Sequence, residues 1–330
     1  MSRLTQLGLR RLVKAVLVGV AVSVSLAAHA GAQDWPTRPL RLVVGFPAGG
    51  SPDIVGRMIS DKLSRRLGQP VVVENAVGGA GVLASDAIAR STPDGYAMVM
   101  LTGAHTGTGA MRKSLPYDPV NGFAMVSTVT AYPMMIVASP DSPVRSLADL
   151  LDRARAAPGK ITYASNAPGS AHHLLGEWIN VEAKTTMVPV PYRGAAQASV
   201  DLLGGRVDVM IDTATTAIEL VRSGKARALA VASPERYPLL PDVPTVAETL
   251  PGVETMSWLG LAMAPGTPQP IVNRLNVELK EILSEPEIKE RLSQLGGVSN
   301  WSTPEQMRAQ IAREIARWNR VIDHKQTERQ

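Results

Sequence analysis

Residues Leu40 to Asp53 read LRLVVGFPAGGSPD, and this stretch decides the fold class. Its apolar start, 40–44, predicts a strand, and the glycine loop that follows leads directly into a helical pattern. Ser51 and Pro52 are the residue types expected at the N-cap and the first position of a helix, and Gly68 is expected to end it. Such a loop exposes unpaired N–H groups and a positive dipole end, which favour an anion or a carboxylate.

Short apolar runs alternate with helical patterns along most of the chain. The runs are rich in Val, Ile, Leu and Met and do not alternate cleanly, as expected for strands covered on both faces. Repeated strand–helix units predict a mainly parallel, doubly wound α/β fold. We expect strands at 40–44, 71–73, 97–101, 134–137, 161–164, 188–190, 207–211, 228–231 and 259–263, helices near 53–67, 82–90, 146–156, 171–182, 195–203 and 214–223, and two long amphipathic helices at 269–284 and 303–322.

The first 30 residues have the features of a secretory signal peptide. A basic start containing Arg3 and Lys14 precedes an apolar run at 15–28 that is too short to span a bilayer comfortably. Ala28-His29-Ala30 is a cleavage site of small residues, and the alternative is an N-terminal membrane anchor. We therefore expect a periplasmic protein with no stable membrane insertion.

Removal of this leader lowers the formal net charge from +5 to +1, because the leader holds four basic and no acidic residues. A nearly neutral protein gives little electrostatic reason to bind nucleic acid. The chain has no cysteine, so its stability must come from the core. About 300 remaining residues suggest two domains with an ample core.

A second glycine loop, 165–170, also follows an expected strand, and Ser170 is the N-cap candidate of the next helix. Two such loops facing each other across a cleft would clamp a small anionic ligand. A third loop, Gly78-Gly79-Ala80-Gly81, is similar to a dinucleotide fingerprint, but the acidic residue expected about 20 positions later is missing. We predict that this loop lines the same cleft, or is an ordinary turn, and that no cofactor binds.

The sequence contains few residues in arrangements typical of catalytic or metal-binding sites. There is no cysteine nucleophile, no G-x-S-x-G and no P-loop, although an unfamiliar hydrolase arrangement stays open. His172 and His173 point about 100° apart on a helix, so they are poorly placed to share a metal. One of them could instead donate to a ligand, and we predict no metal site.

Several side chains at strand ends or helix starts have two readings. His105 follows an expected strand in a Thr/Gly-rich loop and could line the cleft. Asp53 could meet the helix dipole or face the cleft, and Asp212 could contact a ligand or cap the next segment. Tyr192 precedes Arg193, which could clamp a carboxylate or form a surface ion pair.

The chain resembles the Bug-type extracytoplasmic solute-binding receptors of tripartite tricarboxylate transporters. The resemblance covers essentially the whole chain after the leader, and its motifs occur in the family's order. They are Trp35–Pro39, Phe46–Gly50 with Asp53, Gly78–Gly81, Pro93–Tyr96, Leu115–Pro119, Gly169-Ser170 with His173-Leu174 and Glu177, Val190–Gly194, Asp201–Gly205, Leu240–Thr245 and Ala264–Pro268.

The resemblance implies a type II periplasmic-binding, or Venus-flytrap, fold with two lobes around a central cleft. It places lobe 1 at 31–130 plus 256–330 and lobe 2 at 131–255, with crossovers near Thr130 and Thr255. Its members bind small organic acids largely through backbone N–H groups and water. It implies a monomer that makes transient contact with membrane permease subunits and is not an enzyme.

Carried onto this sequence, the resemblance implies a ligand site that includes both capped-helix loops. Two departures, Gly122 before Phe123 and the unusual loop 103–109, bear on which ligand is bound. An exported sensor for a signalling partner and an exported α/β enzyme acting on a small acid are the alternative functions. The candidate ligand-binding residues are Phe46, Ala48, Gly49, Gly50, Ser51, Asp53, Gly79, Ala80, Gly81, His105, Ser165, Gly169, Ser170, His173, Tyr192 and Asp212.

Overall fold

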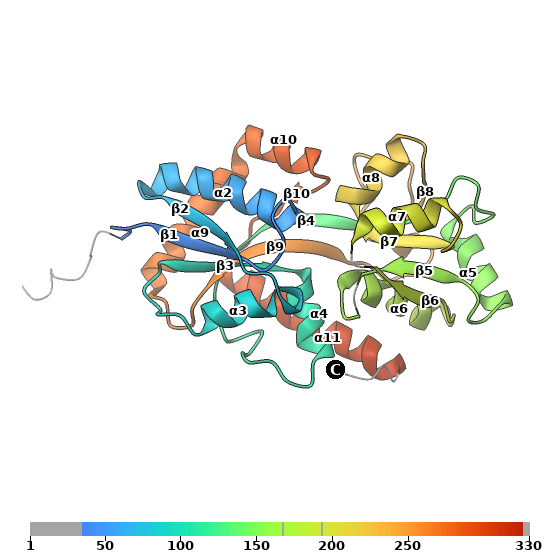
Figure 1. Cartoon of the computed structure of the whole chain (residues 1–330), viewed down its shortest axis with the longest axis horizontal. Helices are drawn as coiled ribbons and strands as arrows, with labels where there is room; N and C mark the ends of the chain where they lie inside the picture. The colour runs from blue at the N-terminus through green and yellow to red at the C-terminus, as the bar shows by residue number, and fades with distance from the viewer. Residues whose placement is uncertain (1–34, 167, 193, 326–330) are drawn as a thin grey trace, which may run out of the picture. The chain divides into compact units, whose positions relative to one another are not determined.

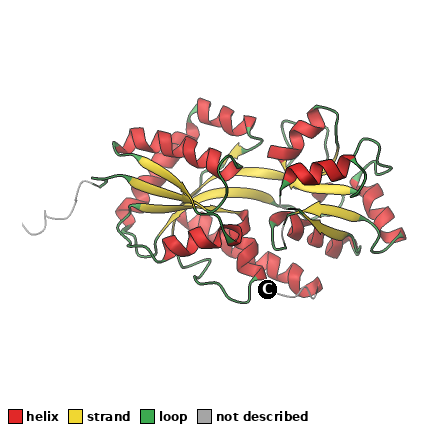
Figure 2. Ribbon diagram, in the orientation of Figure 1, coloured by secondary structure: helices red, strands yellow, loops and turns green. Residues whose placement is uncertain are grey.

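The structure, a computed structural model, describes residues 35–166, 168–192 and 194–325. The predicted signal peptide and Arg193 lie outside the described residues, so the predictions made for them are not addressed by it. The chain divides into a unit that ends at Thr37 and a second unit, Arg38–Gln330. The description below concerns the second unit alone (Figures 1 and 2).

The first half of this unit is a sheet in the order β2-β1-β3-β9-β4 with helices on both faces. Leu42 and Val44 of β1 face α2, where Gly56 allows a close approach, whereas Val43 faces α3 and α11. Alternate residues of one strand thus enter two different core layers. The elements are β1 (Leu40–Val44), α2 (Ser51–Leu67), β2 (Val71–Asn75), η1 (Gly79–Gly81), α3 (Val82–Ala89), β3 (Ala97–Thr102), α4 (Gly103–Met111), β4 (Ala124–Ala138), β9 (Met256–Met263), α9 (Gln269–Ser284), α10 (Pro286–Gln294), β10 (Val298–Ser299) and α11 (Pro304–Lys325).

The second half continues from β4 through β7, β5 and β6, with β8 also paired to β4. Met134 and Ile136 of β4 pack with α5 and α6, while Met135 and Val137 pack with α7 and α8. The elements are α5 (Leu147–Ala156), β5 (Thr162–Ser165), α6 (Ala171–Ala183), β6 (Val188–Pro191), α7 (Ala195–Leu203), β7 (Val209–Thr213), α8 (Ala214–Arg222), β8 (Arg227–Val231) and η2 (Val246–Glu248).

Strand β4 belongs to both halves because it changes partners along its length. Its residues from Ala124 to Pro133 pair with β9, and those from Met134 to Ala138 pair with β7 and β8. Both sets of pairs are antiparallel, and parallel pairing between the named strands of the described residues occurs in β2-β1-β3 and β7-β5-β6. The expectation of a mainly parallel sheet is therefore wrong for the strands that join the halves, although the doubly wound α/β class is confirmed.

Helix α11 also contributes to both cores. Met307 and Ile311 near its start pack with the first half, and Trp318, Val321 and Ile322 pack with the second. Between them lies Glu314, whose Oε2 accepts hydrogen bonds from Thr106 Oγ1 at 2.9 Å and Trp258 Nε1 at 2.9 Å. One amphipathic helix thus covers apolar surface of both halves.

Most predicted elements occur within a few residues of their expected positions. Three exceptions stand out: β4 begins ten residues before its expected start at 134, the loop expected at 103–109 is helix α4, and α10 was not expected. The N-cap of α2 is Gly50 and not Ser51, whereas Ser170 is the N-cap of α6 as predicted. Among the described residues, no helix is long and apolar enough to cross a membrane.

The lobe boundaries implied by the resemblance remain a prediction. Thr130 lies within β4, three residues before its last pair with β9, and Thr255 directly precedes β9. Both positions are thus close to the place where the sheet changes partners.

Gly176 on α6 offers a test of this packing. A Cβ atom there would overlap the ring of Tyr163, which is fully buried and donates its hydroxyl hydrogen to Glu177 Oε1 at 2.8 Å. We expect Gly176→Ala to lower the free energy of unfolding by about 1–3 kcal/mol in urea denaturation, because the ring has no free space to enter.

Gly194→Ser is the matched control. No atom lies within 4 Å of a Cβ built at Gly194, and its φ of −176° is extended. We expect a change within about 0.5 kcal/mol, as is usual for an exposed substitution. Equal losses in both variants would contradict the proposed overlap.

Candidate functional site

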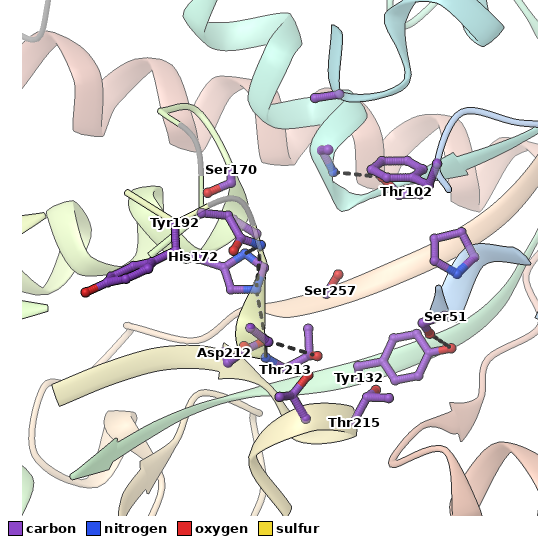
Figure 3. A pocket seen from close by; sticks show the side chains of 18 of the residues that line it. Ser51, Thr102, Tyr132, Ser170, His172, Tyr192, Asp212, Thr213, Thr215 and Ser257 are labelled. Atoms are coloured by element: carbon purple, nitrogen blue, oxygen red, sulfur yellow. Dashed lines mark hydrogen bonds and ion pairs between the residues drawn. The ribbon is translucent and has the colours of Figure 1, made fainter. Parts of the chain in front are cut away.

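A cavity of about 650 Å³ opens where β4 changes partners (Figure 3). Both halves contribute to its wall, with Tyr132 from β4 and Ser257 and Leu259 from β9 at the junction. The other lining residues are Phe46, Ser51, Pro52, Ala80, Thr102, Ala104, Asn166, Pro168, Ser170, Ala171, His172, Pro191, Tyr192, Ala195, Asp212, Thr213, Thr215 and Thr216.

The first turns of helices from both halves meet at this cavity. Lining residues occur at the starts of α2, α4, α6, α7 and α8. The N-cap side chains of α4 and α6 satisfy one N–H each, but α7 and α8 have no side-chain cap bond. Because helix N-termini carry unpaired N–H groups and about half a positive charge, the wall favours an anion. Among the described lining residues there is no lysine or arginine.

The loop before α2 is held from behind by Asp53. Its Oδ2 accepts from the Gly49 N–H at 2.9 Å, and its Oδ1 accepts from Asn75 Nδ2 at 2.9 Å. Arg57, one helical turn later, reaches both carboxylate oxygens at 2.9–3.0 Å. Gly49 has a φ of +81°, a conformation that glycine adopts readily, so the carboxylate fixes a turn that a larger residue would resist.

These contacts change the titration of Asp53. The hydrogen bond from Arg57, supported by those from Gly49 and Asn75, lowers its pKa from the usual 3.8 to about 2, against burial, which raises it. The side chain is buried and does not line the cavity. Asp53 therefore stabilises the start of α2 and the loop before it, and it does not face the cavity.

Ser51 contributes to the cavity wall through its side chain. Its Oγ donates a hydrogen bond to the Tyr132 hydroxyl at 3.0 Å, and burial raises the pKa of that tyrosine. Ala80, at a φ of +58° in the Gly78–Gly81 loop, also lines the cavity. The Phe46 ring lies about 3.4 Å from the position of a Cβ on Gly81, so the two loops pack together.

The loop before α6 is the counterpart, in the second half, of the loop before α2. Ser170 Oγ accepts the His173 N–H at 3.2 Å, and His173 Nδ1 accepts the Gly169 N–H at 3.4 Å. Burial lowers the pKa of His173. The backbone of Gly169 packs so closely on α4 that a Cβ at Gly107 would overlap its carbonyl oxygen. This loop is therefore anchored on both sides.

A polar cluster on the wall of the second half joins His172, Asp212 and Thr213 (Figure 3). His172 Nε2 lies 3.2 Å from Asp212 Oδ1, which also accepts the Thr213 N–H at 2.6 Å. Tyr192 lines the same wall, but its hydroxyl donates to Asp201 Oδ2 at 2.8 Å. Tyr192 thus offers the cavity its ring rather than its hydroxyl group.

The structure brings some of the predicted residues to the cavity lining and not others. Phe46, Ser51, Ala80, Ser170, Tyr192 and Asp212 line it. Those that do not are Ala48, Gly49, Gly50, Asp53, Gly79, Gly81, His105, Ser165, Gly169 and His173.

His105 is the clearest correction, because it points into the core and not into the cavity. Its ring stacks on Tyr117 at 5.8 Å and meets Phe123 edge-on, and its Nε2 donates to the Pro119 carbonyl at 2.8 Å. Burial disfavours the imidazolium and lowers its pKa to about 4. It therefore stays neutral at physiological pH and packs as an aromatic residue.

The prediction missed much of the wall. His172 was weighed beside His173, and its position at the start of α6 was a usable signal. Tyr132, Ser257 and Thr213 lie where strands exchange partners, which no local pattern marks. Among the described residues, no group of three metal-ligating side chains is present.

An α/β chain with two sheet halves around a cavity lined by helix N-termini has the fold of a periplasmic solute-binding protein. Its residues 55–327 match the sequence pattern of the tripartite tricarboxylate transporter family receptor, TctC. BugT of Bordetella pertussis is 36% identical over 310 residues, which are 93% of this chain and 95% of BugT. The chain belongs to the TctC family.

Solved structures agree with this assignment. Rpa4515 of R. palustris, solved with adipate, has a TM-score of 0.79 and 34% identity, covering 88% of this chain and 98% of that one. MatC from Rhodopseudomonas palustris with bound malate has a TM-score of 0.76 and 32% identity, covering 87% and 100%. The family consists of transporter receptors, so this protein is a solute-binding receptor and not an enzyme.

The role of Asp53 gives a prediction about stability and pH. Its folded-state pKa is lower than its unfolded value, so the stabilisation is present above about pH 4 and is lost as the pH falls towards 2. We expect Asp53→Asn to lower the free energy of unfolding at pH 7 by about 1–3 kcal/mol and to flatten its dependence on pH below 4.

Asp61→Asn is the control, since Asp61 forms the same i,i+4 pair with Arg65 on α2 but is 60% exposed. We expect this change to cost about 0.5 kcal/mol or less. Urea denaturation at several pH values measures both variants. An Asp53→Asn protein as stable as the control would show that the loop does not depend on this carboxylate.

Proposed function

We propose that this receptor binds a small organic acid through its carboxylate in the cavity and delivers it to a membrane permease of the tripartite tricarboxylate type. The observation that supports this best is the convergence of helix N-termini on a cavity whose described lining has no lysine or arginine. A carboxylate accepts hydrogen bonds from backbone N–H groups, and the dipoles compensate its charge.

The chemistry of the relatives agrees with this proposal. Adipate and malate, the ligands in the Rpa4515 and MatC structures, are both carboxylates. The cavity also has apolar surfaces, including Phe46, Pro52 and Leu259, which suit the carbon skeleton of an organic acid. We therefore place the carboxylate at the helix starts and the carbon chain against these surfaces.

The remaining parts of the proposal concern location and movement. The features of residues 1–30 support export to the periplasm with removal of the leader. We propose that 31–130 with 256–330 and 131–255 are the two lobes, and that a monomer closes them over the ligand. Closure removes the carboxylate from water and strengthens its hydrogen bonds.

A carboxylic acid and its primary amide have nearly the same shape, but only the ionised acid carries a negative charge. Comparing their affinities therefore tests whether the cavity recognises the charge. We expect adipate or hexanoate to bind with micromolar affinity in isothermal titration, and adipamide and hexanamide to bind at least about tenfold more weakly. Equal affinities for acids and amides would contradict anion recognition. Binding of neither class of compound would remove the support for an organic-acid receptor.

A pair of variants at Ala104, on the first turn of α4, tests the location of the anion. Glu and Gln have nearly the same size, so both would obstruct the cavity equally, but Ala104→Glu also adds a negative charge beside the helix starts. We expect Ala104→Glu to weaken carboxylate binding about tenfold more than Ala104→Gln. Equal effects would argue against an anion at this wall.

Delivery to a permease and signalling through a partner protein can be distinguished by experiment. We expect the ligand-loaded receptor to restore uptake of a radiolabelled ligand by cells that carry the permease but lack the receptor. Restored uptake supports transport. A loaded receptor that captures a signalling protein and leaves uptake unchanged would favour the sensor alternative.

A further inference from the structure

Asp212 is the one acidic side chain among the described residues that line the cavity. It is the second-last residue of β7, which leads directly into α8, and the residue is only 6% exposed. A carboxylate is an unexpected neighbour for a site that receives an anion, because like charges repel strongly where water is excluded. Its hydrogen bonds show what the site can accept.

The two oxygens of Asp212 are used unequally. Oδ1 lies 3.2 Å from His172 Nε2, 2.6 Å from the Thr213 N–H and 3.5 Å from Thr213 Oγ1. Because an ionised carboxylate only accepts, the nitrogen of His172 that faces it must carry the proton. No hydrogen bond from the described residues reaches Oδ2, and this oxygen is not among the fully enclosed unpaired atoms, so it is an acceptor open to the cavity.

His172 holds this acceptor in place. The amide nitrogen of Asn166, which also lines the cavity, lies 3.3 Å from Nδ1 and 3.4 Å from Nε2, so the ring of His172 is in contact with both Asn166 and Asp212. Figure 3 shows His172, Asp212 and Thr213 together on one wall, across the cavity from Ser51 and Tyr132. The carboxylate is therefore oriented before any ligand arrives.

We propose that Asp212 Oδ2 accepts a hydrogen bond from the ligand, so that the preferred ligand is a monocarboxylic acid that also carries a hydroxyl or ammonium group. The inference rests on the proposed function, which supplies the carboxylate at the helix starts. A ligand that fills the cavity displaces water from this oxygen, and a donor on the ligand then replaces the lost hydrogen bond, whereas an unpaired carboxylate oxygen would be costly. A second carboxylate at the same place would be repelled by Asp212.

Ligands matched in length test this preference. One set is hexanoate, 6-hydroxyhexanoate, 6-aminohexanoate and adipate, and a shorter set is butanoate, 4-hydroxybutanoate, 4-aminobutanoate and succinate. In isothermal titration, we expect the hydroxy or amino acid of a set to bind at least about tenfold more tightly than the other two compounds. The compounds of a set differ only in the group at the end opposite the shared carboxylate, which is the end that we expect to face Asp212.

The variant Asp212→Asn tests whether the Asp212 side chain causes this ligand preference. The amide oxygen can still accept from His172 and Thr213, but the charge is gone and a donor replaces Oδ2. We expect the affinity for the amino acid to fall about tenfold or more, and the affinity for the dicarboxylate to rise by a similar factor. Circular dichroism and the melting temperature check that the variant is folded.

Asp208→Asn is the matched control, because Asp208 immediately precedes β7 and bonds to Thr162, away from the cavity lining. Its ligand order is expected to equal that of the wild-type protein. A dicarboxylate that binds most tightly, with an affinity unchanged by Asp212→Asn, would overturn this inference and leave the proposed function intact. Failure of every acid in both sets to bind would overturn both.

Discussion

The pairing of β4 with β9 is the constraint on which the rest of the structure depends. Pro133 is the last β4 residue paired with β9, and Met134 is the first paired with β7. The sheet therefore changes partners within one step of a single strand. The cavity forms at that step, since Tyr132, Ser257 and Thr213 reach its wall from the three strands involved. Ligand sites of open α/β sheets commonly lie at such a change in topology.

In the proposed function, backbone N–H groups at the helix starts compensate the charge of the ligand, and Asp212 is the one acidic side chain of the described lining. The ion pair of Asp53 and Arg57 lies outside the cavity lining, where it holds the loop before α2. Helix starts then supply diffuse positive potential that does not dictate the shape of an anion. The polar and aromatic side chains of the lining would then determine which organic acid is preferred. Asp212 contributes a negative charge and Tyr192 an aromatic ring, and neither is expected in a site that recognises only an anion.

Features that depend on neighbouring residues in the chain were predicted from the sequence more accurately than features that depend on contacts between distant residues. Strand–helix alternation and the Ser170 cap were predictable because both depend on neighbours in the chain. Helix α4 was missed because its Gly- and Thr-rich sequence is a poor helix former, and packing against α11 outweighs that preference. The start of β4 was missed because Ser127, Thr128 and Thr130 interrupt its apolar pattern, although all three are buried by distant residues. His105 misled for the same reason, since only the fold shows that it is buried.

The packing of α11 has a consequence for how the protein unfolds. Its first turns complete one core and its last turns, around Trp318, complete the other. Detachment of this one helix would therefore expose apolar surface in both halves at once. The stabilities of the two cores are coupled in this way, which favours one cooperative unfolding transition over two separate ones.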